Sequence, residues 1–310
     1  MINIKKVEEI LYSCVNMTVL EQHPDVSGLK RIKLIPEDVR ILLNYNFLKC
    51  SNGVFFDLGE QHFDIVVFSV FLDQQCLDYV LNQLKGKKVL IIVHHFFDMN
   101  CGYDEENPGM DTFFYESSLY KKLYNNGVQI CVLHFPCDIN SSKINTHKSF
   151  FQNIFGSLKL HEPVHTFPFG EMGYYAYIKK EQLHSVSQYP KIIYYGKQYE
   201  SFEEAIKKLE TICDERPLKV AVWAGMISST EILKEIEKQM YDLCICGDVL
   251  LRNKSERSSE MLNYLENMSV NVFCISHYQS ELFALKDLAK ELEPTTDAQM
   301  IVLEDRTLWK

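Results

Sequence analysis

An unbroken apolar run at residues 89–93 (VLIIV) is followed at once by two histidines, His94 and His95. A run of this length, preceded by Lys87 and Lys88, is typical of a strand buried on both faces, as in a parallel sheet. Ligand sites of α/β sheets lie at the carboxyl ends of such strands, and imidazole is the commonest metal ligand in proteins. The run therefore predicts an α/β fold with a ligand site where this strand ends.

Composition argues against several classes of function. The 310 residues are 46% hydrophobic and 24% charged, enough for a full core and for two domains or lobes. A net charge of −10 argues against a nucleic-acid-binding surface, which needs dense positive charge. The first residues lack the apolar core of a signal peptide, and no segment reaches the roughly 18 apolar residues of a membrane span. We therefore expect a globular protein without membrane or nucleic-acid partners.

The ten cysteines contain no Cys-x-x-Cys pair. Four of them stand inside apolar runs, where a thiol behaves as a small buried hydrophobe: Cys131, Cys244, Cys246 and Cys274. Neither disulfides nor a zinc–thiolate site is expected from this spacing. A reducing, cytoplasmic location is expected instead.

Strand and helix patterns alternate along both halves of the chain. In the first half, strand patterns cover residues 63–72, 89–93 and 128–133, with helical spacing over 74–84. In the second half they cover 218–223, 243–246, 270–275 and 300–303, with helical segments that include 231–240 and 280–292. The order predicts a first lobe at 1–155 and a second at 156–310, with the C-terminal segment packing back on the first. An acidic loop at 98–111 is a candidate lid or rim.

Histidines directly follow three of these strands, or follow after one small residue, and two of the three ends carry a carboxylate four residues further on. If a helix follows the strand, positions i and i+4 share a face and point into one crevice. Neutral nitrogen and anionic oxygen donors suit zinc, iron, manganese or nickel better than calcium. The candidate ligands are His94, His95, His134, Asp138, His277 and Glu281.

Each candidate also has an ordinary structural interpretation. Alone, Asp138 is an N-cap, Glu281 is a first-turn acid favoured by the helix dipole, and His134 is a hydrogen-bonded loop residue. The repeated placement of these residues makes a metal site the better interpretation of the set. The other six histidines are interpreted as loop residues: His23, His62, His147, His161, His165 and His184.

Three segments resemble the signature blocks of the Nif-three-like dinuclear metal-centre family, some of whose members are labelled GTP cyclohydrolase I type 2. They are 89–97 (VLIIVHHFF), 130–138 (ICVLHFPCD) and 274–281 (CISHYQSE). The family's blocks are a strand ending in His-His-Pro, a strand ending in His-Thr-x-x-Asp, and Gly-His-x-x-x-Glu, in this order. The likeness extends to the N-terminal helix and to several loops: Ser27, Gly28 and Leu29, residues 170–173, Gly225, and Gly247 with Asp248.

The chain departs from the family pattern at three places. Phe96 replaces the proline after the histidine pair, and Ser276 replaces the glycine before His277. After Asp248 the chain has Leu250, Leu251 and Arg252 where the family has a histidine. The expected ligands are retained, and the departures affect the side chains that would face a substrate.

The resemblance implies two intertwined α/β lobes of similar design with a metal cleft between them, and a ring-shaped homohexamer. It implies two divalent transition-metal ions of unknown identity. Their ligands would be His94, His95, Asp138, His277 and Glu281, with Glu281 as the bridging carboxylate. His134 would stand in or just outside the coordination shell, where proton transfer is a further role.

The implied ligand set indicates a class of chemistry. Two carboxylates against two divalent ions leave a charge of about +2, which attracts an anionic or carbonyl-bearing substrate. Open positions on two ions suit hydrolysis by activated water. A metal-dependent hydrolase is the leading hypothesis, and the family label implies a GTP cyclohydrolase-like reaction on a nucleotide. The alternative is a metal-binding interaction or regulatory protein without turnover. No Gly-x-x-x-x-Gly-Lys-Ser/Thr phosphate loop is present.

Overall fold

A computed structural model describes residues 1–33, 35–59, 61–96, 117–161, 163–168, 170–189, 191–249 and 256–304. The loop at 98–111 and the segment from Leu250 to Arg252 lie outside the described residues. Within the described part, the chain forms two compact units. The first comprises residues 1–137, 142–144 and those from 284 onward, and the second comprises 138–141 and 145–283. The chain therefore crosses between the units more than once.

The first unit is built on a five-stranded sheet with the order β14-β4-β5-β6-β2. Its strands are β2 (Gly53–Val54), β4 (Ile65–Phe71), β5 (Val89–His95), β6 (Gln129–Val132) and β14 (Gln299–Val302). The four strands from β14 to β6 run parallel, and β2 pairs antiparallel with β6 at one edge. A separate two-stranded ladder joins β1 (Ile2–Asn3) to β3 (His62–Phe63). The C-terminal strand thus pairs within the first unit.

Alternating side chains of β4 and β5 explain why both strands are continuously apolar. Val67 and Ile91 point into a cluster with the helices on one face of the sheet. Val66 and Leu90, their neighbours along the strands, are also completely buried, on the other face. Because both faces are covered, neither strand has a polar side, as expected of a parallel sheet.

In the described residues up to 138, eight α-helices precede or connect these strands. They are α1 (Ile4–Cys14), α2 (Val19–Gln22), α3 (Val26–Ile32), α4 (Glu37–Arg40), α5 (Tyr45–Cys50), α6 (Gln74–Asp78), α7 (Ser117–Asn125) and α8 (Phe135–Asp138). A π-helical turn (Tyr79–Gln83) continues α6. The short helices α2 to α5 carry no long periodic pattern, and the sequence did not predict them.

The second unit contains another five-stranded sheet, with the order β10-β13-β12-β11-β9. Its strands are β9 (Tyr174–Ile178), β10 (Ile193–Tyr195), β11 (Leu218–Ile227), β12 (Leu243–Val249) and β13 (Asn271–Cys274). The central three are parallel, and both edge strands are antiparallel. A hairpin of β7 (His165–Phe167) and β8 (Gly170–Met172) lies outside this sheet.

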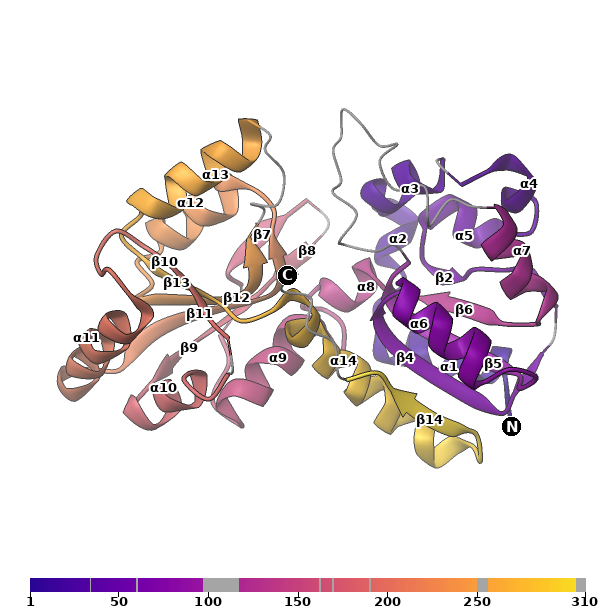
Figure 1. Cartoon of the computed structure of the whole chain (residues 1–310). Coiled ribbons are helices and arrows are strands. Elements are labelled where there is room, and N and C mark those ends of the chain that lie inside the picture. The colour runs from indigo at the N-terminus through magenta and orange to yellow at the C-terminus, as the bar shows by residue number, and fades with distance from the viewer. Residues whose placement is uncertain are drawn as a thin grey trace. The chain divides into compact units, whose positions relative to one another are not determined.

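Helices cover both faces of the second sheet (Figure 1). On one face are α9 (Thr146–Phe155), α10 (Lys180–Val186) and α11 (Phe202–Glu215), packed on Val220 and Ile245. On the other are α12 (Thr230–Lys238) and α13 (Glu256–Asn267), packed on Ala221 and Cys244. Each unit is therefore an α/β layered structure, and the α/β prediction is confirmed.

The helix α14 (His277–Leu292) begins three residues earlier than its apolar spacing indicates. Ser276 explains the difference: its hydroxyl accepts a hydrogen bond from the Gln279 backbone N–H at 3.3 Å, and its carbonyl accepts one from Ser280 at 3.0 Å. Ser276 thereby acts as an N-cap where the family pattern has glycine. His277 and Glu281 consequently lie on the same helical face, one turn apart.

Candidate metal centre

Three imidazoles meet within the first unit. His94 and His95 are the last two residues of β5, and His134 follows the neighbouring strand β6 after one residue. The ring centroids of His94 and His95 are 4.4 Å apart, and that of His134 lies 5.0 Å from His94 and 4.4 Å from His95. One nitrogen from each ring lies within 4.8 Å of the other two. Because β5 and β6 are parallel neighbours, their carboxyl ends bring these side chains together.

The orientation of His94 is set by the backbone of the adjacent strand end. Its Nδ1 lies 3.0 Å from the carbonyl oxygen of Leu133. A carbonyl only accepts, so Nδ1 carries the proton and donates it. In the neutral ring Nε2 then keeps its lone pair, which is the arrangement seen in most metal-binding histidines.

His95 leans toward the other neighbouring strand. Its ring stacks on that of Phe71 with centroids 4.9 Å apart and an angle of 13°. Phe71 and His95 are also register partners between β4 and β5. His95 thus contacts Phe71 of β4 while its ring remains 4.4 Å from those of His94 and His134.

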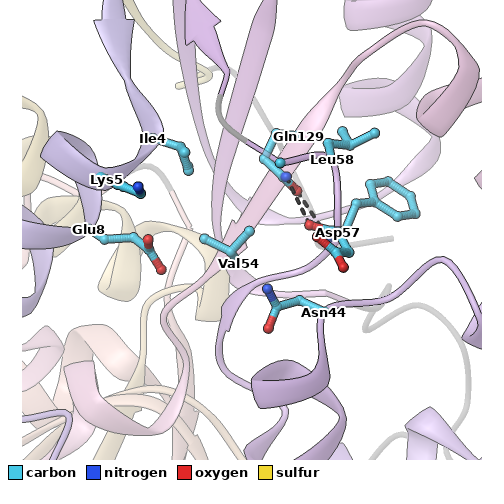
Figure 2. A pocket seen from close by; sticks show the side chains of 10 residues that line it. Ile4, Lys5, Glu8, Asn44, Val54, Asp57, Leu58 and Gln129 are labelled. Carbon is cyan, nitrogen blue, oxygen red and sulfur yellow. Dashed lines mark hydrogen bonds between the residues drawn. The ribbon is translucent and has the colours of Figure 1, made fainter.

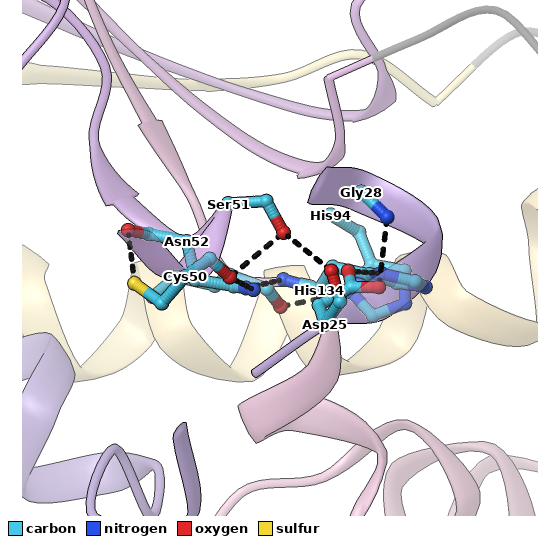
Figure 3. Close-up of polar contacts among 8 residues, drawn as sticks. Asp25, Gly28, Cys50, Ser51, Asn52, His94 and His134 are labelled. Carbon is cyan, nitrogen blue, oxygen red and sulfur yellow. Dashed lines mark hydrogen bonds and ion pairs between the residues drawn. The ribbon is translucent and has the colours of Figure 1, made fainter. Parts of the chain in front are cut away.

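His134 is held by two side chains that the sequence interpretation did not single out (Figure 3). Its Nδ1 lies 2.6 Å from Oδ2 of Asp25, and its backbone N–H donates to Oδ1 of Asn52 at 2.8 Å. Asp25 is only 6% exposed and comes from the loop that enters α3. Its only sequence signal was the nearby glycine loop, because a contact over 109 positions is not visible in local patterns.

The second unit contains a histidine–carboxylate pair at the start of α14. His277 Nε2 lies 3.0 Å from Glu281 Oε1, and both side chains are 4% exposed. Ligand atoms bound at about 2.1 Å to one ion, at angles of about 90–109°, are about 3.0–3.4 Å apart. At this distance Nε2 donates a hydrogen bond to the carboxylate, and the spacing also suits two neighbouring ligands of one ion, for which Nε2 would give up that proton.

A bulge in β11 lies directly against this pair. The register between β11 and β12 shifts between Trp223 and Met226, and Gly225 has φ +68°. A Cβ on Gly225 would lie 2.3 Å from Glu281 Oε1 and 3.6 Å from His277 Nε2. Only glycine allows the backbone to approach the carboxylate this closely.

Two side chains hold the bulge through its backbone N–H groups. His147 Nδ1 accepts from Ala224 at 2.9 Å, and the Ser280 hydroxyl accepts from Gly225 at 2.9 Å. The interpretation of His147 as a loop residue is wrong, because it is a buried residue of α9. It is also wrong for three other histidines, which belong to β3, β7 and α10: His62, His165 and His184. The sequence also did not single out Ser280, whose role depends on the approach of two distant segments.

Asp138 is the last residue of α8 and is the first residue of the second unit. Its Oδ1 accepts a hydrogen bond from the Thr146 hydroxyl at 2.8 Å. The structure thus groups three predicted residues in the first unit and two in the second, and places Asp138 where the chain passes from one to the other. Their assignment as metal ligands stays a prediction.

A family model of Duf34/NIF3, the NGG1p interacting factor 3 family, matches residues 49–307 of this chain. The chain belongs to the NIF3 family. The match covers every predicted ligand and confirms the resemblance expected from the three sequence blocks. No curated protein sequence matches this chain significantly.

Solved structures share the NIF3 fold of the chain. Reduced HcgD from Methanocaldococcus jannaschii superposes with a TM-score of 0.60 at 17% identity, covering 98% of this chain and 100% of that one. A Bacillus cereus protein related to NIF3 superposes with a TM-score of 0.56 at 11% identity, covering 99% of this chain and 98% of that one. A hypothetical protein of Staphylococcus aureus superposes with a TM-score of 0.54 at 12% identity, covering 95% of this chain and 96% of that one. At these identities the likeness shows the fold alone.

Buried thiols form a second group in this NIF3 chain. Cys246 and Cys274 are register partners on β12 and β13, with sulfurs 3.4 Å apart, and both are free and buried. Burial raises the pKa of both thiols, chiefly because the thiolate would lose its hydration. The interpretation of Cys131, Cys244, Cys246 and Cys274 as small core residues agrees with their complete burial.

A pocket of about 240 Å³ lies elsewhere in the first unit (Figure 2). It is lined by Lys5, Glu8, Asn44, Asp57 and Gln129 among others, and its lining contains no histidine or cysteine. Gln129 is the first residue of β6, whereas the imidazoles stand at the carboxyl ends of the strands. The pocket is therefore separate from the histidine cluster.

Among the described residues, no helix combines the length and apolar character needed to span a membrane.

Proposed function

We propose that the chain is a metal-dependent hydrolase with a dinuclear centre. The observation that carries the proposal is the cluster of His94, His95 and His134, whose nitrogens lie within 4.8 Å of one another inside one unit. The pair of His277 and Glu281 supplies further donors at ligand spacing. This mixture of imidazole and carboxylate groups fits zinc, iron, manganese or nickel.

The donor set also determines the charge of the centre. The imidazoles are neutral ligands, so Asp138 and Glu281 supply the negative charge, about −2 against +4 from two divalent ions. The remaining charge of about +2 favours an anionic substrate or one with a polarisable carbonyl. Two bound divalent ions supply a lowered pKa for water and electrostatic stabilisation of the attacking and leaving oxygens.

The chain's own residues position these donors. Leu133 and Asp25 orient two imidazoles through Nδ1, and the bulge at Gly225 leaves room for the Glu281 carboxylate. As a substrate class we propose a nucleotide-like or other small anionic compound. A GTP cyclohydrolase-like reaction is the specific version that the family resemblance supports.

A second candidate is a metal-binding interaction or regulatory protein that keeps the centre without turnover. The name of the family, NGG1p interacting factor 3, refers to a protein interaction and supports this alternative. We further propose a homohexamer, which the family resemblance supports. A cytoplasmic location is supported by the nine described cysteines, all of which are free.

The experiment measures metal content and turnover together. Protein loaded separately with zinc, manganese, iron or nickel is analysed for metals per chain and assayed on GTP, phosphate esters and amides. We expect two ions per chain and turnover that is lost in His94→Ala and Glu281→Ala. His184→Ala is the matched control, because His184 forms an exposed histidine–carboxylate pair with Glu210 at 2.8 Å.

The outcomes separate the candidates. Two bound ions without turnover on any substrate would favour the binding protein. Failure to retain any metal after loading would reject both. The molar mass in solution, measured by light scattering, tests the hexamer independently of the metal.

A further inference from the structure

We propose that Asp25 is a positioning residue that holds His134 with its Nε2 lone pair available as a metal donor. The inference rests on the proposed metal centre and adds a residue to it. The two side chains meet at 2.6 Å between Asp25 Oδ2 and His134 Nδ1, and both are largely buried, with exposures of 6% and 18%. Burial makes this hydrogen bond stronger than one at the surface, because water competes with it less.

Asp25 is itself held in place by its surroundings (Figure 3). Its Oδ1 accepts the Gly28 N–H at 2.9 Å, and its carbonyl accepts the Ser51 hydroxyl at 3.3 Å. A Cβ on Gly28 would lie 2.2 Å from Ser51 Oγ and 2.9 Å from Asp25 Oδ2, so glycine permits this close packing. The carboxylate therefore presents Oδ2 to His134 from a constrained loop.

The protonation pattern follows from the chemistry of the two groups. An ionised carboxylate only accepts hydrogen bonds, so His134 Nδ1 must carry a proton. In the neutral imidazole the lone pair is then on Nε2. His94 reaches the same tautomer through the carbonyl of Leu133. Two of the three clustered rings thus offer the Nε2 lone pair to a metal before any ion binds. This lowers the entropic cost of ordering the rings on metal binding.

The substitution Asp25→Asn tests this role with almost no change in volume. An amide has one accepting oxygen, whereas Asp25 uses both of its oxygens, on Gly28 and His134. If that oxygen stays on Gly28, the amide NH₂ faces His134 Nδ1, which must then accept. The proton of the neutral ring moves to Nε2 and blocks the donor atom.

The readouts are the tautomer and the metal affinity. Long-range ¹H–¹⁵N spectra of metal-free protein labelled with ¹⁵N-histidine report the tautomer, and His134→Gln assigns the signals. We expect the Nδ1–H form in the wild type and the Nε2–H form in Asp25→Asn. Zinc affinity, measured by competition with a coloured chelator, is expected to fall by about 10–100-fold. Asp25→Glu keeps the carboxylate and should restore the tautomer.

Asp242→Asn is the control for the loss of a paired aspartate. Asp242 also uses both oxygens, on Arg216 at 2.6 and 2.7 Å, but it lies in the second unit at the amino end of β12. It should change neither the histidine spectra nor the zinc affinity.

Two results would overturn the inference: an unchanged His134 tautomer in Asp25→Asn, or a zinc affinity equal to that of the wild type. Because the spectra need neither metal nor substrate, they test Asp25 even if the proposed hydrolase has no turnover. If the wild type binds no zinc but Asp25→Asn still changes the His134 tautomer, the metal centre is rejected and the orientation of His134 by Asp25 is supported.

Discussion

At the scale of single residues, Gly225 is where the backbone comes closest to a proposed ligand. We expect Gly225→Ala to cost roughly 1–2 kcal/mol of folding stability, because alanine is strained at φ +68°. Its methyl group would also displace the Glu281 carboxylate, from which a Cβ would be 2.3 Å away. Metal affinity should therefore fall about tenfold or more, as for other losses of ligand positioning. Chelator competition and urea unfolding measure the two effects.

The control Gly59→Ala separates the effect of backbone strain from the effect of displacing the Glu281 carboxylate. Gly59 has φ +66°, and a Cβ built there has no heavy atom within 4 Å. The control should lose a similar amount of stability and keep its metal affinity. Equal affinities in the two variants would show that Gly225 acts only on the backbone.

The buried thiols predict a loss of stability at alkaline pH. Burial raises the pKa of Cys246 well above its ordinary value, so the folded state keeps the thiol neutral. In the unfolded chain the thiol ionises near pH 8.5. The contribution of its burial to the free energy of unfolding is therefore complete below that pH and declines as the pH rises. Between pH 7.5 and 9.5 the ionisation of one such thiol in the unfolded chain lowers the free energy of unfolding by about 1.4 kcal/mol. Urea unfolding should show this much less pH dependence in Cys246→Ala than in the wild type; identical slopes would contradict it.

At the scale of elements, the bulge of β11 depends on Ser280 in a different element. Ser280→Ala would leave the buried Gly225 N–H without its acceptor, which lies at 2.9 Å. We expect a loss of about 1–3 kcal/mol in the free energy of unfolding and weaker metal binding, because Gly225 contacts Glu281. Ser13→Ala is the control, since the contacts of the Ser13 hydroxyl, with Ile10 and Cys14, lie within its own helix. A stability loss no larger than the control's would contradict the role of Ser280.

The sequence predicted the strands whose ends carry the candidate histidines. The apolar runs of β4, β5 and β6 were visible because strands buried on both faces have no polar side. The short elements α2 to α5 and the edge strands β9 and β10 were not predicted. Their stability comes from packing against the sheets, and their local sequences have no strong period.

At the scale of the whole molecule, the expected ligands are distributed over both units, His94, His95 and His134 in the first and His277 and Glu281 in the second. Metal binding should therefore reduce amide hydrogen exchange at two distant segments, the end of β5 and the first turns of α14. Exchange measured by mass spectrometry, with zinc and with a chelator, tests this directly. At zinc concentrations of about 100 times the dissociation constant, the stabilisation should be about 2.7 kcal/mol. Protection confined to β5 would limit the centre to the three imidazoles.

The sequence alone determined the α/β class, the strand ends that carry histidines, and the four-residue spacing of His277 and Glu281, but it placed the start of α14 three residues too late. These features follow from local periodicity, because each depends on residues fewer than about ten positions apart. Only the tertiary structure decided that Asp25 orients His134 across 109 positions and that His147 and Ser280 hold the bulge at Gly225. These contacts join segments that are far apart in the sequence. The segments meet only when the helices and strands of each unit pack together.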